Sequence, residues 1–153
     1  MATIYVVTHG NTEEGPDPRH TPEGLKRIME LPIPSGVSRV VCGTGRRFLE
    51  ILDAKLPHMD PSVPVQYYAA VGGSEAFDGP TVILPDGRRI NKTAYMSVSI
   101  NGVELWRWLC LLPDRTLLCS GDPLITGLGF NNALRGQIYE LDTVTKHGRK
   151  FVG

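Results

Sequence analysis

The apolar run at residues 4–7, which passes directly into Thr-His-Gly-Asn-Thr at residues 8–12, is the feature that most constrains the fold of this chain. An apolar run of this length that stops at a glycine indicates a buried strand meeting solvent. In open α/β sheets, ligands bind at that edge. His9 is therefore the first candidate for a reacting group, and Gly10 has no side chain to obstruct an approaching anion.

Segments with strand character alternate with segments of helical spacing along the rest of the chain. The predicted strands cover residues 3–8, 37–42, 65–70, 116–119, 137–144 and 150–152, and a hairpin is predicted over 81–90 with its turn at 85–87. Such alternation predicts an α/β fold with a mainly parallel sheet flanked by helices.

Four helices are predicted from apolar spacing and from residues that favour helix ends. Thr21 is the expected N-cap of the first helix, with Pro22 at its first position, and Asp122-Pro123 is the expected capped start of the last. The second helix is expected to stop at Pro57. The apolar stripes of the four helices are Leu25, Ile28 and Met29; Phe48, Ile51, Leu52 and Leu56; Val103, Trp106, Leu109 and Cys110; and Leu124, Ile125 and Leu128.

Composition limits the architecture and the partners. The 153 residues, 41% of them hydrophobic, predict a single domain over 1–153. Because the formal net charge is zero, no nucleic acid or anionic membrane surface is expected as a partner, and any bound anion must be held by local positive groups. No prediction follows for the oligomeric state.

Cysteine content and hydropathy bear on the compartment. The chain has three cysteines, Cys42, Cys110 and Cys119, which cannot all pair within the chain. Met1 leads directly into a strand-like run instead of a secretory segment. No apolar stretch approaches the roughly 20 residues needed to span a bilayer. Reduced thiols in the cytoplasm are therefore expected.

Loops of small residues follow three of the predicted strands, at residues 8–10, 42–47 and 119–122. Glycines there let backbone N–H groups point at a ligand, and the start of the following helix adds a partial positive charge. Arg46 or Arg47 would supply a guanidinium that can hold two phosphate oxygens at once. If these loops meet at one edge of the sheet, they form a small phosphate pocket.

Other phosphate chemistries and cofactor sites do not fit the spacing. A cysteine-based phosphatase requires five residues between Cys and Arg, whereas Cys42 and Arg47 enclose four. The chain has no Gly-x-x-x-x-Gly-Lys-[Ser/Thr] loop, and residues 43–45 lack the third glycine of a dinucleotide fingerprint. No spacing of histidines and cysteines is typical of zinc. Neither a metal nor a cofactor is predicted.

Together these segments resemble the histidine phosphatase superfamily, which has the phosphoglycerate mutase-like fold. The resemblance rests on the strand and His-Gly-x-Thr at residues 4–12, the helix start at 20–25, the strand and arginine loop at 40–47, and the strand, turn and helix start at 117–124. The short chain is most similar to the compact branch that includes small phosphohistidine phosphatases. The resemblance implies a three-layer sandwich with a mostly parallel central sheet and helices on both faces.

The resemblance also implies roles for individual residues. His9 would attack phosphorus to form a phosphohistidine, Arg47 would bind and stabilise the phosphoryl oxygens, and Glu75 would protonate the leaving oxygen. The surrounding phosphate-binding positions would be Thr8, Gly10, Asn11, Thr12, Arg47 and Gly121.

This chain departs from the family pattern at two of those positions. The arginine expected before the nucleophile is Thr8, and the second histidine is Gly121. Because each lost donor to a developing oxyanion commonly costs ~10²–10³ in rate, the two losses would impair catalysis. Of the other histidines, His20 is better placed to compensate than His58 or His147.

Two functions therefore remain open. In the first, the chain is a phosphatase that hydrolyses a phosphomonoester or phosphohistidine through a phospho-His9 intermediate. In the second, it is a non-catalytic relative that binds a phosphorylated small molecule or a phosphoprotein. The retained His9, Gly10, Thr12 and Arg47 favour the first, and Thr8 and Gly121 favour the second.

Overall fold

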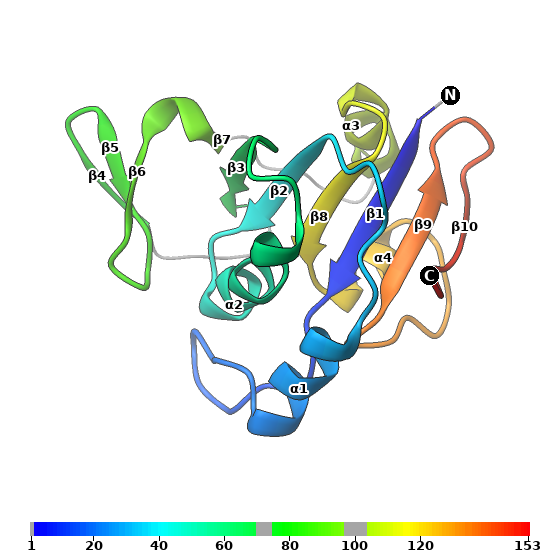
Figure 1. Cartoon of the computed structure of the whole chain (residues 1–153), viewed down its shortest axis with the longest axis horizontal. Helices are drawn as coiled ribbons and strands as arrows, with labels where there is room; N and C mark the ends of the chain where they lie inside the picture. The colour runs from blue at the N-terminus through cyan, green and yellow to red at the C-terminus, as the bar shows by residue number, and fades with distance from the viewer. Residues whose placement is uncertain (1, 70–74, 97–103) are drawn as a thin grey trace.

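The computed structural model describes residues 2–69, 75–96 and 104–153, and its centre is a seven-stranded sheet (Figure 1). In spatial order the strands are β10 (His147–Lys150), β9 (Ile138–Asp142), β1 (Thr3–Thr8), β8 (Thr116–Ser120), β2 (Arg39–Gly43), β3 (Val65–Tyr68) and β7 (Tyr95–Met96). The five strands from β1 to β7 are parallel, and β9 and β10 are antiparallel additions at one edge. The predicted mostly parallel α/β sheet is confirmed.

Helices cover both faces of this sheet. α1 (Pro22–Glu30) and α2 (Arg46–Lys55, followed by the short η1, Leu56–His58) lie on one face, and α3 (Leu105–Leu111) and α4 (Asp122–Gly127) lie on the other (Figure 1). Side chains of β1 alternate between the two layers, as the pleat requires. Tyr5 and Val7 pack in the core with α1 and α2, whereas Ile4 and Val6 pack with α3 and α4. The fold is therefore the expected three-layer sandwich.

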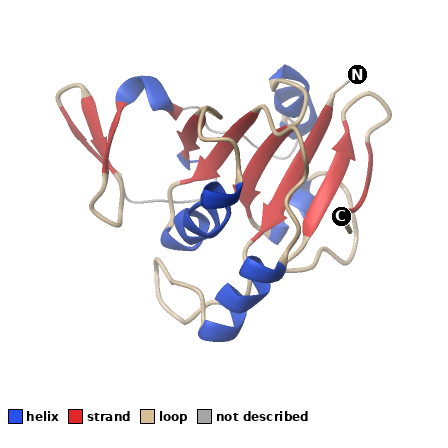
Figure 2. Ribbon diagram, in the orientation of Figure 1, coloured by secondary structure: helices blue, strands red, loops and turns tan. Residues whose placement is uncertain are grey.

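A small antiparallel sheet stands beside the β7 edge of the main sheet (Figure 2). It consists of β4 (Ala76–Asp78), β5 (Thr81–Ile83) and β6 (Arg89–Asn91), and the short η3 (Lys92–Ala94) leads from it to β7. The predicted hairpin over 81–90 is confirmed, and Gly87 adopts the positive φ of 92° that its turn requires. The pattern did not predict β4. Buried Val82 and Leu84 join this sheet to the core beside α2.

The first helix begins as predicted, but its apolar stripe is narrower than expected. Thr21 caps α1 by accepting a hydrogen bond from the Gly24 amide at 3.1 Å. Ile28 is fully buried, whereas Met29 is 66% exposed, which makes the prediction for Met29 wrong. One residue advances about 100° around a helix, so Met29 leaves the face on which Gly24 and Ile28 lie.

Two predicted element starts and one predicted core position also require correction. Asp122 does not cap α4: it is the first helical residue, and the N-cap Gly121 makes no side-chain capping bond. Cys110 is exposed on α3, and Val103 lies outside the described residues. The last strand begins at His147, three residues before the predicted start, because the turn closes at Lys146 with a φ of 58°.

The loop that follows β1 packs backbone to backbone on the first turn of α1. A Cβ atom on Gly10 would lie 2.6 Å from the Gly24 carbonyl oxygen, and a Cβ on Gly24 would lie 2.1 Å from the Asn11 carbonyl oxygen. The same Asn11 oxygen accepts a hydrogen bond from the Thr21 amide at 2.9 Å. Both glycines are thus required for close packing, which fixes α1 against the loop after His9.

We expect Gly24→Ala to destabilise the protein by about 1–3 kcal/mol, because the added methyl overpacks a backbone contact. Alanine is otherwise the better helix former, so intrinsic propensity predicts the opposite sign. Urea unfolding gives the free energy of unfolding.

The matched control is Gly127→Ala in α4, where the added Cβ would meet only Leu105 Cδ2, at 3.4 Å. That control is expected to leave stability unchanged or to raise it. Equal stability of the wild type and the Gly24→Ala variant would contradict the close approach.

Candidate active site

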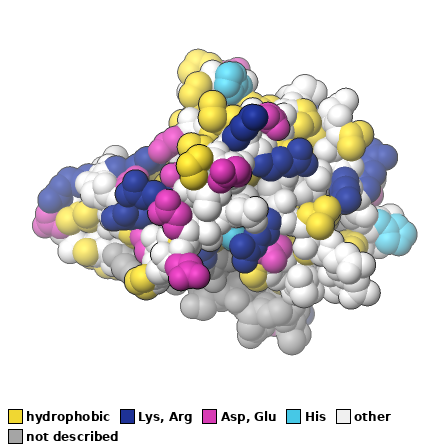
Figure 3. Space-filling view, turned by 90° about the horizontal axis from the view of Figure 1, so that it is seen from below, with side chains coloured by type: hydrophobic (Ala, Val, Ile, Leu, Met, Phe, Trp, Pro, Cys, Tyr) yellow, Lys and Arg dark blue, Asp and Glu magenta, His cyan; other side chains and the backbone are white. Residues whose placement is uncertain are grey.

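The three predicted loops meet at one edge of the sheet because β1, β8 and β2 are neighbouring parallel strands. His9 directly follows β1, and its amide donates a hydrogen bond of 3.0 Å to the Ser120 carbonyl at the end of β8. β9 runs antiparallel to β1, so the residues that precede β9 reach the same edge. Figure 3 faces this edge and shows a small area of histidine surface beside basic and acidic side chains.

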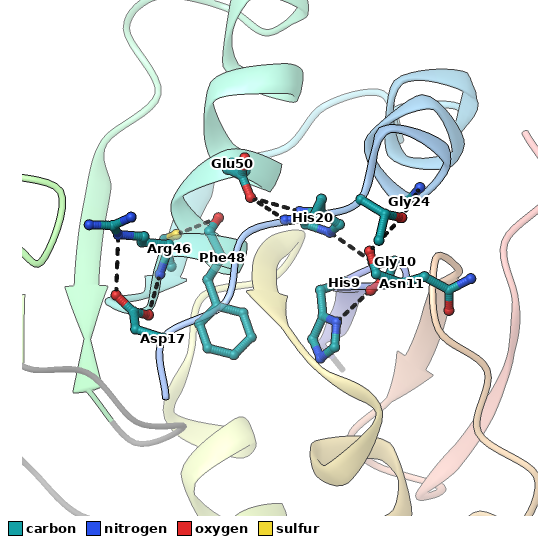
Figure 4. Close-up of polar contacts among 11 residues, drawn as sticks. His9, Gly10, Asn11, Asp17, His20, Gly24, Arg46, Phe48 and Glu50 are labelled. Carbon is teal, nitrogen blue, oxygen red and sulfur yellow. Dashed lines mark hydrogen bonds and ion pairs between the residues drawn. The ribbon is translucent and has the colours of Figure 1, made fainter. Parts of the chain in front are cut away.

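The His9 ring is buried, with 6% of the residue exposed, and its tautomer follows from its contacts. Nδ1 lies 2.8 Å from the Gly10 carbonyl oxygen (Figure 4). A carbonyl can only accept, so Nδ1 carries the proton and Nε2 keeps its lone pair. The ring packs edge-on against Phe48, with 5.8 Å between centroids. His9 therefore presents an unprotonated Nε2, as a nucleophilic imidazole must.

The environment keeps this imidazole neutral. Burial is the largest effect and lowers the pKa of His9, and the positive charges of Arg47 and Arg135 lower it further. The Gly10 carbonyl and the Asp122 carboxylate act in the opposite direction. Since burial disfavours the charged form and two cations add repulsion, the neutral ring prevails.

Of the two adjacent arginines, only Arg47 has a guanidinium that forms no ion pair with an acidic side chain in the described part of the chain. The Arg46 side chain pairs with Asp17 at 3.5 Å, and its amide donates to the same carboxylate at 3.0 Å. The Arg47 guanidinium lies over the Phe48 ring, 4.3 Å from its centroid, and makes no hydrogen bond or ion pair with any described residue. Burial lowers the pKa of Arg47, as does the charge of Arg135, while Asp17 raises it. A partly buried cation of this kind can accept an anionic ligand.

His20 has a different role from the one predicted, since both of its ring nitrogens are occupied. Nε2 accepts a hydrogen bond from the Gly10 amide at 2.9 Å, and Nδ1 lies 3.1 Å from a carboxylate oxygen of Glu50 (Figure 4). Burial lowers the pKa of His20 despite this carboxylate. A neutral His20 therefore holds the loop after His9 in place and is not available as a phosphate ligand. His58 and His147 are exposed, in η1 and β10.

Thr8, at the position where the resemblance implies an arginine, is fully buried and hydrogen-bonded to the segment before β9. Its hydroxyl donates to the Leu134 carbonyl at 2.6 Å and accepts from the Gln137 amide at 3.1 Å. The Gly10 amide, a predicted phosphate donor, is likewise taken by His20. At both positions, groups predicted to bind phosphate instead form hydrogen bonds within the protein.

The remaining predicted positions lie around His9 at different distances. A Cβ on Gly121 would lie 3.0 Å from His9 Cδ2 and 3.2 Å from Nε2, so this position adjoins the ring directly. Asn11 is exposed, and Thr12 is half-buried and bridges to His20.

Glu75 is anchored to the loop that precedes Arg47. One carboxylate oxygen accepts a hydrogen bond of 3.2 Å from the hydroxyl of buried Thr44, directly after β2, and the other accepts one of 2.5 Å from the Tyr95 hydroxyl. No contact among the described residues joins Glu75 to His9 itself.

Arg135 and Asp122 complete the charged groups at His9, and the sequence pattern did not single them out as binding groups. Asp122 Oδ1 lies 4.0 Å from His9 Nε2 and 3.8 Å from Arg135 Nε. Arg135 belongs to no motif and could only have been found by expecting the start of β9 at this edge. Within the described ranges, no group of three or more His, Cys, Asp or Glu side chains could hold a metal ion. No helix in these ranges has the length and apolarity required to cross a membrane.

Comparison with known proteins identifies the fold. No family model and no curated protein matches the sequence. Among solved structures, a putative phosphohistidine phosphatase SixA from Nakamurella multipartitia matches with a TM-score of 0.54 and 16% identity, over 98% of this chain and 93% of that one. A phosphoglycerate mutase from Thermus thermophilus matches with a TM-score of 0.57 and 15% identity, over 92% of each chain. The chain therefore has a histidine phosphatase-like, phosphoglycerate mutase-like fold.

We expect the free energy of unfolding to fall as the pH is lowered from about 7 through 6.5. The pKa values of His9 and His20 in the folded protein lie below the ordinary 6.5, so the unfolded chain binds protons first. Each histidine contributes a slope of up to about 1.4 kcal/mol per pH unit between its unfolded and folded pKa values. Urea unfolding at a series of pH values from 5 to 8 measures this pH dependence of the free energy of unfolding.

His20→Gln should reduce this slope, whereas His147→Gln, on an exposed strand, should retain it. Identical slopes in the two variants would show that His20 is not held neutral.

We further expect Thr8→Val to destabilise the protein by about 1–3 kcal/mol, because it leaves the Leu134 carbonyl and the Gln137 amide without their partner. Thr126→Val, on the exposed side of α4, makes the same chemical change without such a loss. Chemical denaturation gives the free energy of unfolding of both variants. Equal stabilities of the two would rule out the structural role of the Thr8 hydroxyl.

Proposed function

We propose that this protein binds a phosphoryl group between His9 and Arg47 and hydrolyses a phosphomonoester or phosphohistidine. The observation that carries the proposal is that an unprotonated His9 Nε2 and the Arg47 guanidinium, which has no acidic partner among the described residues, belong to side chains that both pack against Phe48. The fold shared with a putative phosphohistidine phosphatase supports this chemistry. The substrate would be a phosphorylated small molecule or a phosphoprotein. Three free cysteines suit the reducing cytoplasm as its location.

In the proposed reaction, the lone pair of His9 Nε2 attacks phosphorus, and the bond from phosphorus to the leaving group breaks, at oxygen in a phosphomonoester and at the imidazole nitrogen in phosphohistidine. The Gly10 carbonyl, hydrogen-bonded to Nδ1–H, favours the positive charge that the ring acquires. Arg47 stabilises the phosphoryl oxygens as charge spreads over them. The leaving oxygen or nitrogen takes its proton from water, or from Glu75 when its carboxyl group is protonated. Water then cleaves phospho-His9 to release inorganic phosphate and the free imidazole.

A second candidate function is the binding of a phosphorylated ligand or protein without turnover. Asp122 weighs against catalysis, because its carboxylate lies 4.0 Å from the nucleophilic nitrogen and opposes the approach of phosphorus to that nitrogen. Gly121 weighs against catalysis as well, since a glycine beside the ring supplies no side chain to the phosphoryl oxygens.

Hydrolysis of para-nitrophenyl phosphate by the wild type and by His9→Ala separates the two candidates. A phosphatase should lose all activity in His9→Ala. Arg47→Ala should lose ~10²–10³ in rate, as expected for removal of one oxyanion-stabilising group. Arg46→Ala is the matched control, because its guanidinium is already paired with Asp17, and it should keep wild-type activity.

Equal, slow hydrolysis by the wild type and His9→Ala would contradict the catalytic proposal. The binding function would then stand only if orthophosphate bound to the wild type and lost affinity in Arg47→Ala. If the wild type failed to bind orthophosphate, both candidate functions would be wrong.

A further inference from the structure

The replacement of an arginine by Thr8 removes one positive charge from the site, and the structure holds another at the same edge. Arg135 lies in the segment between α4 and β9, with a half-exposed side chain. Because β9 runs antiparallel to β1, this segment passes beside the end of β1, where His9 lies. A cation thus reaches the site from a segment outside the motifs that carry the resemblance.

The residues on either side of Arg135 are fixed to the protein by hydrogen bonds. The Leu134 carbonyl accepts from the buried Thr8 hydroxyl at 2.6 Å, and the Leu134 amide donates to the Tyr139 hydroxyl at 2.8 Å. The Gly136 amide donates to the carbonyl of His9 itself at 2.8 Å, and the Gly136 carbonyl accepts from Arg27 at 2.8 Å. The backbone of Arg135 is therefore held in a fixed position relative to His9.

The charge of Arg135 is directed toward the site. It lowers the pKa values of both His9 and Arg47, so the two guanidinium groups and the imidazole are close enough to interact electrostatically. Asp122 lies near both Arg135 and His9: its Oδ1 is 3.8 Å from Arg135 Nε and 4.0 Å from His9 Nε2. Arg47 and Arg135 thus place two positive charges near the His9 ring, and the Asp122 carboxylate lies beside it. In this arrangement a bound oxyanion would replace Asp122 as the partner of Arg135.

We infer that Arg135 supplies the second positive charge of the phosphoryl site, in place of the arginine that Thr8 replaces, and that a bound phosphoryl group displaces Asp122 from Arg135. This inference rests on the proposed function. The pair of Asp122 and Arg135 is partly exposed, and such pairs are weak enough to separate when a doubly charged ligand binds. The Thr8 hydroxyl, by holding Leu134, positions the segment that carries the substituting arginine.

The test is titration calorimetry with inorganic phosphate on the full chain. Arg135→Ala and Arg47→Ala should each weaken binding by roughly tenfold to a hundredfold, as expected for loss of a charge-assisted hydrogen bond. Asp122→Asn should strengthen binding, because it removes a competing negative charge. Arg149→Ala is the matched control. It also removes one positive charge, but Arg149 is exposed on β10 and pairs with Glu140 on β9, so this variant should bind phosphate like the wild type. Far-ultraviolet circular dichroism verifies that each variant is folded.

The outcomes separate this inference from the proposed function. If Arg47→Ala weakens phosphate binding while Arg135→Ala binds like Arg149→Ala, Arg135 does not belong to the site and the proposed function stands. Weaker binding by Asp122→Asn would overturn the displacement of Asp122. If the wild type does not bind phosphate at all, the proposed function fails, and the inference fails with it.

Discussion

The main chain of His9 is hydrogen-bonded on both sides, and the geometry of the candidate site depends on this. Its amide donates to the Ser120 carbonyl at the end of β8, and its carbonyl accepts from the Gly136 amide just before β9. These bonds continue the parallel pairing of β1 with β8 and its antiparallel pairing with β9. Because His9 is fixed between two strands, its ring emerges at the sheet edge with Nδ1 directed at Gly10 and Nε2 toward Asp122.

The position at which the sequence resemblance implies an arginine is linked to Arg135 by hydrogen bonding. Thr8 has a hydroxyl that binds the segment before β9, and that segment carries Arg135. An arginine restored at position 8 would have to enter the fully buried volume of this hydroxyl and would break its bonds to Leu134 and Gln137. The same hydroxyl that fills position 8 therefore fixes the segment that brings Arg135 to this edge.

Much of the fold could be predicted because hydrophobic periodicity reports burial. The runs that became β1, β2 and β8 are buried on both faces, as expected for parallel strands between two layers of helices, and the carboxyl ends of parallel strands share one edge, which brings His9 and Arg47 there. The hydrogen-bond partners of the side chains at the site could not be predicted in this way. The bond from Gly10 to His20 and those of Thr8 join residues far apart in sequence, and Arg135 lies in an irregular loop whose position depends on the direction of β9.

The central claim is that His9, Arg47 and Arg135 face one oxyanion. A crystal structure of the protein grown with orthovanadate tests it most directly. The account predicts vanadium bonded to His9 Nε2, with its oxygens contacting the guanidinium groups of Arg47 and Arg135 and with Asp122 turned away. A structure in which the His9 and Arg47 side chains point away from each other, or in which vanadate binds elsewhere, would contradict it.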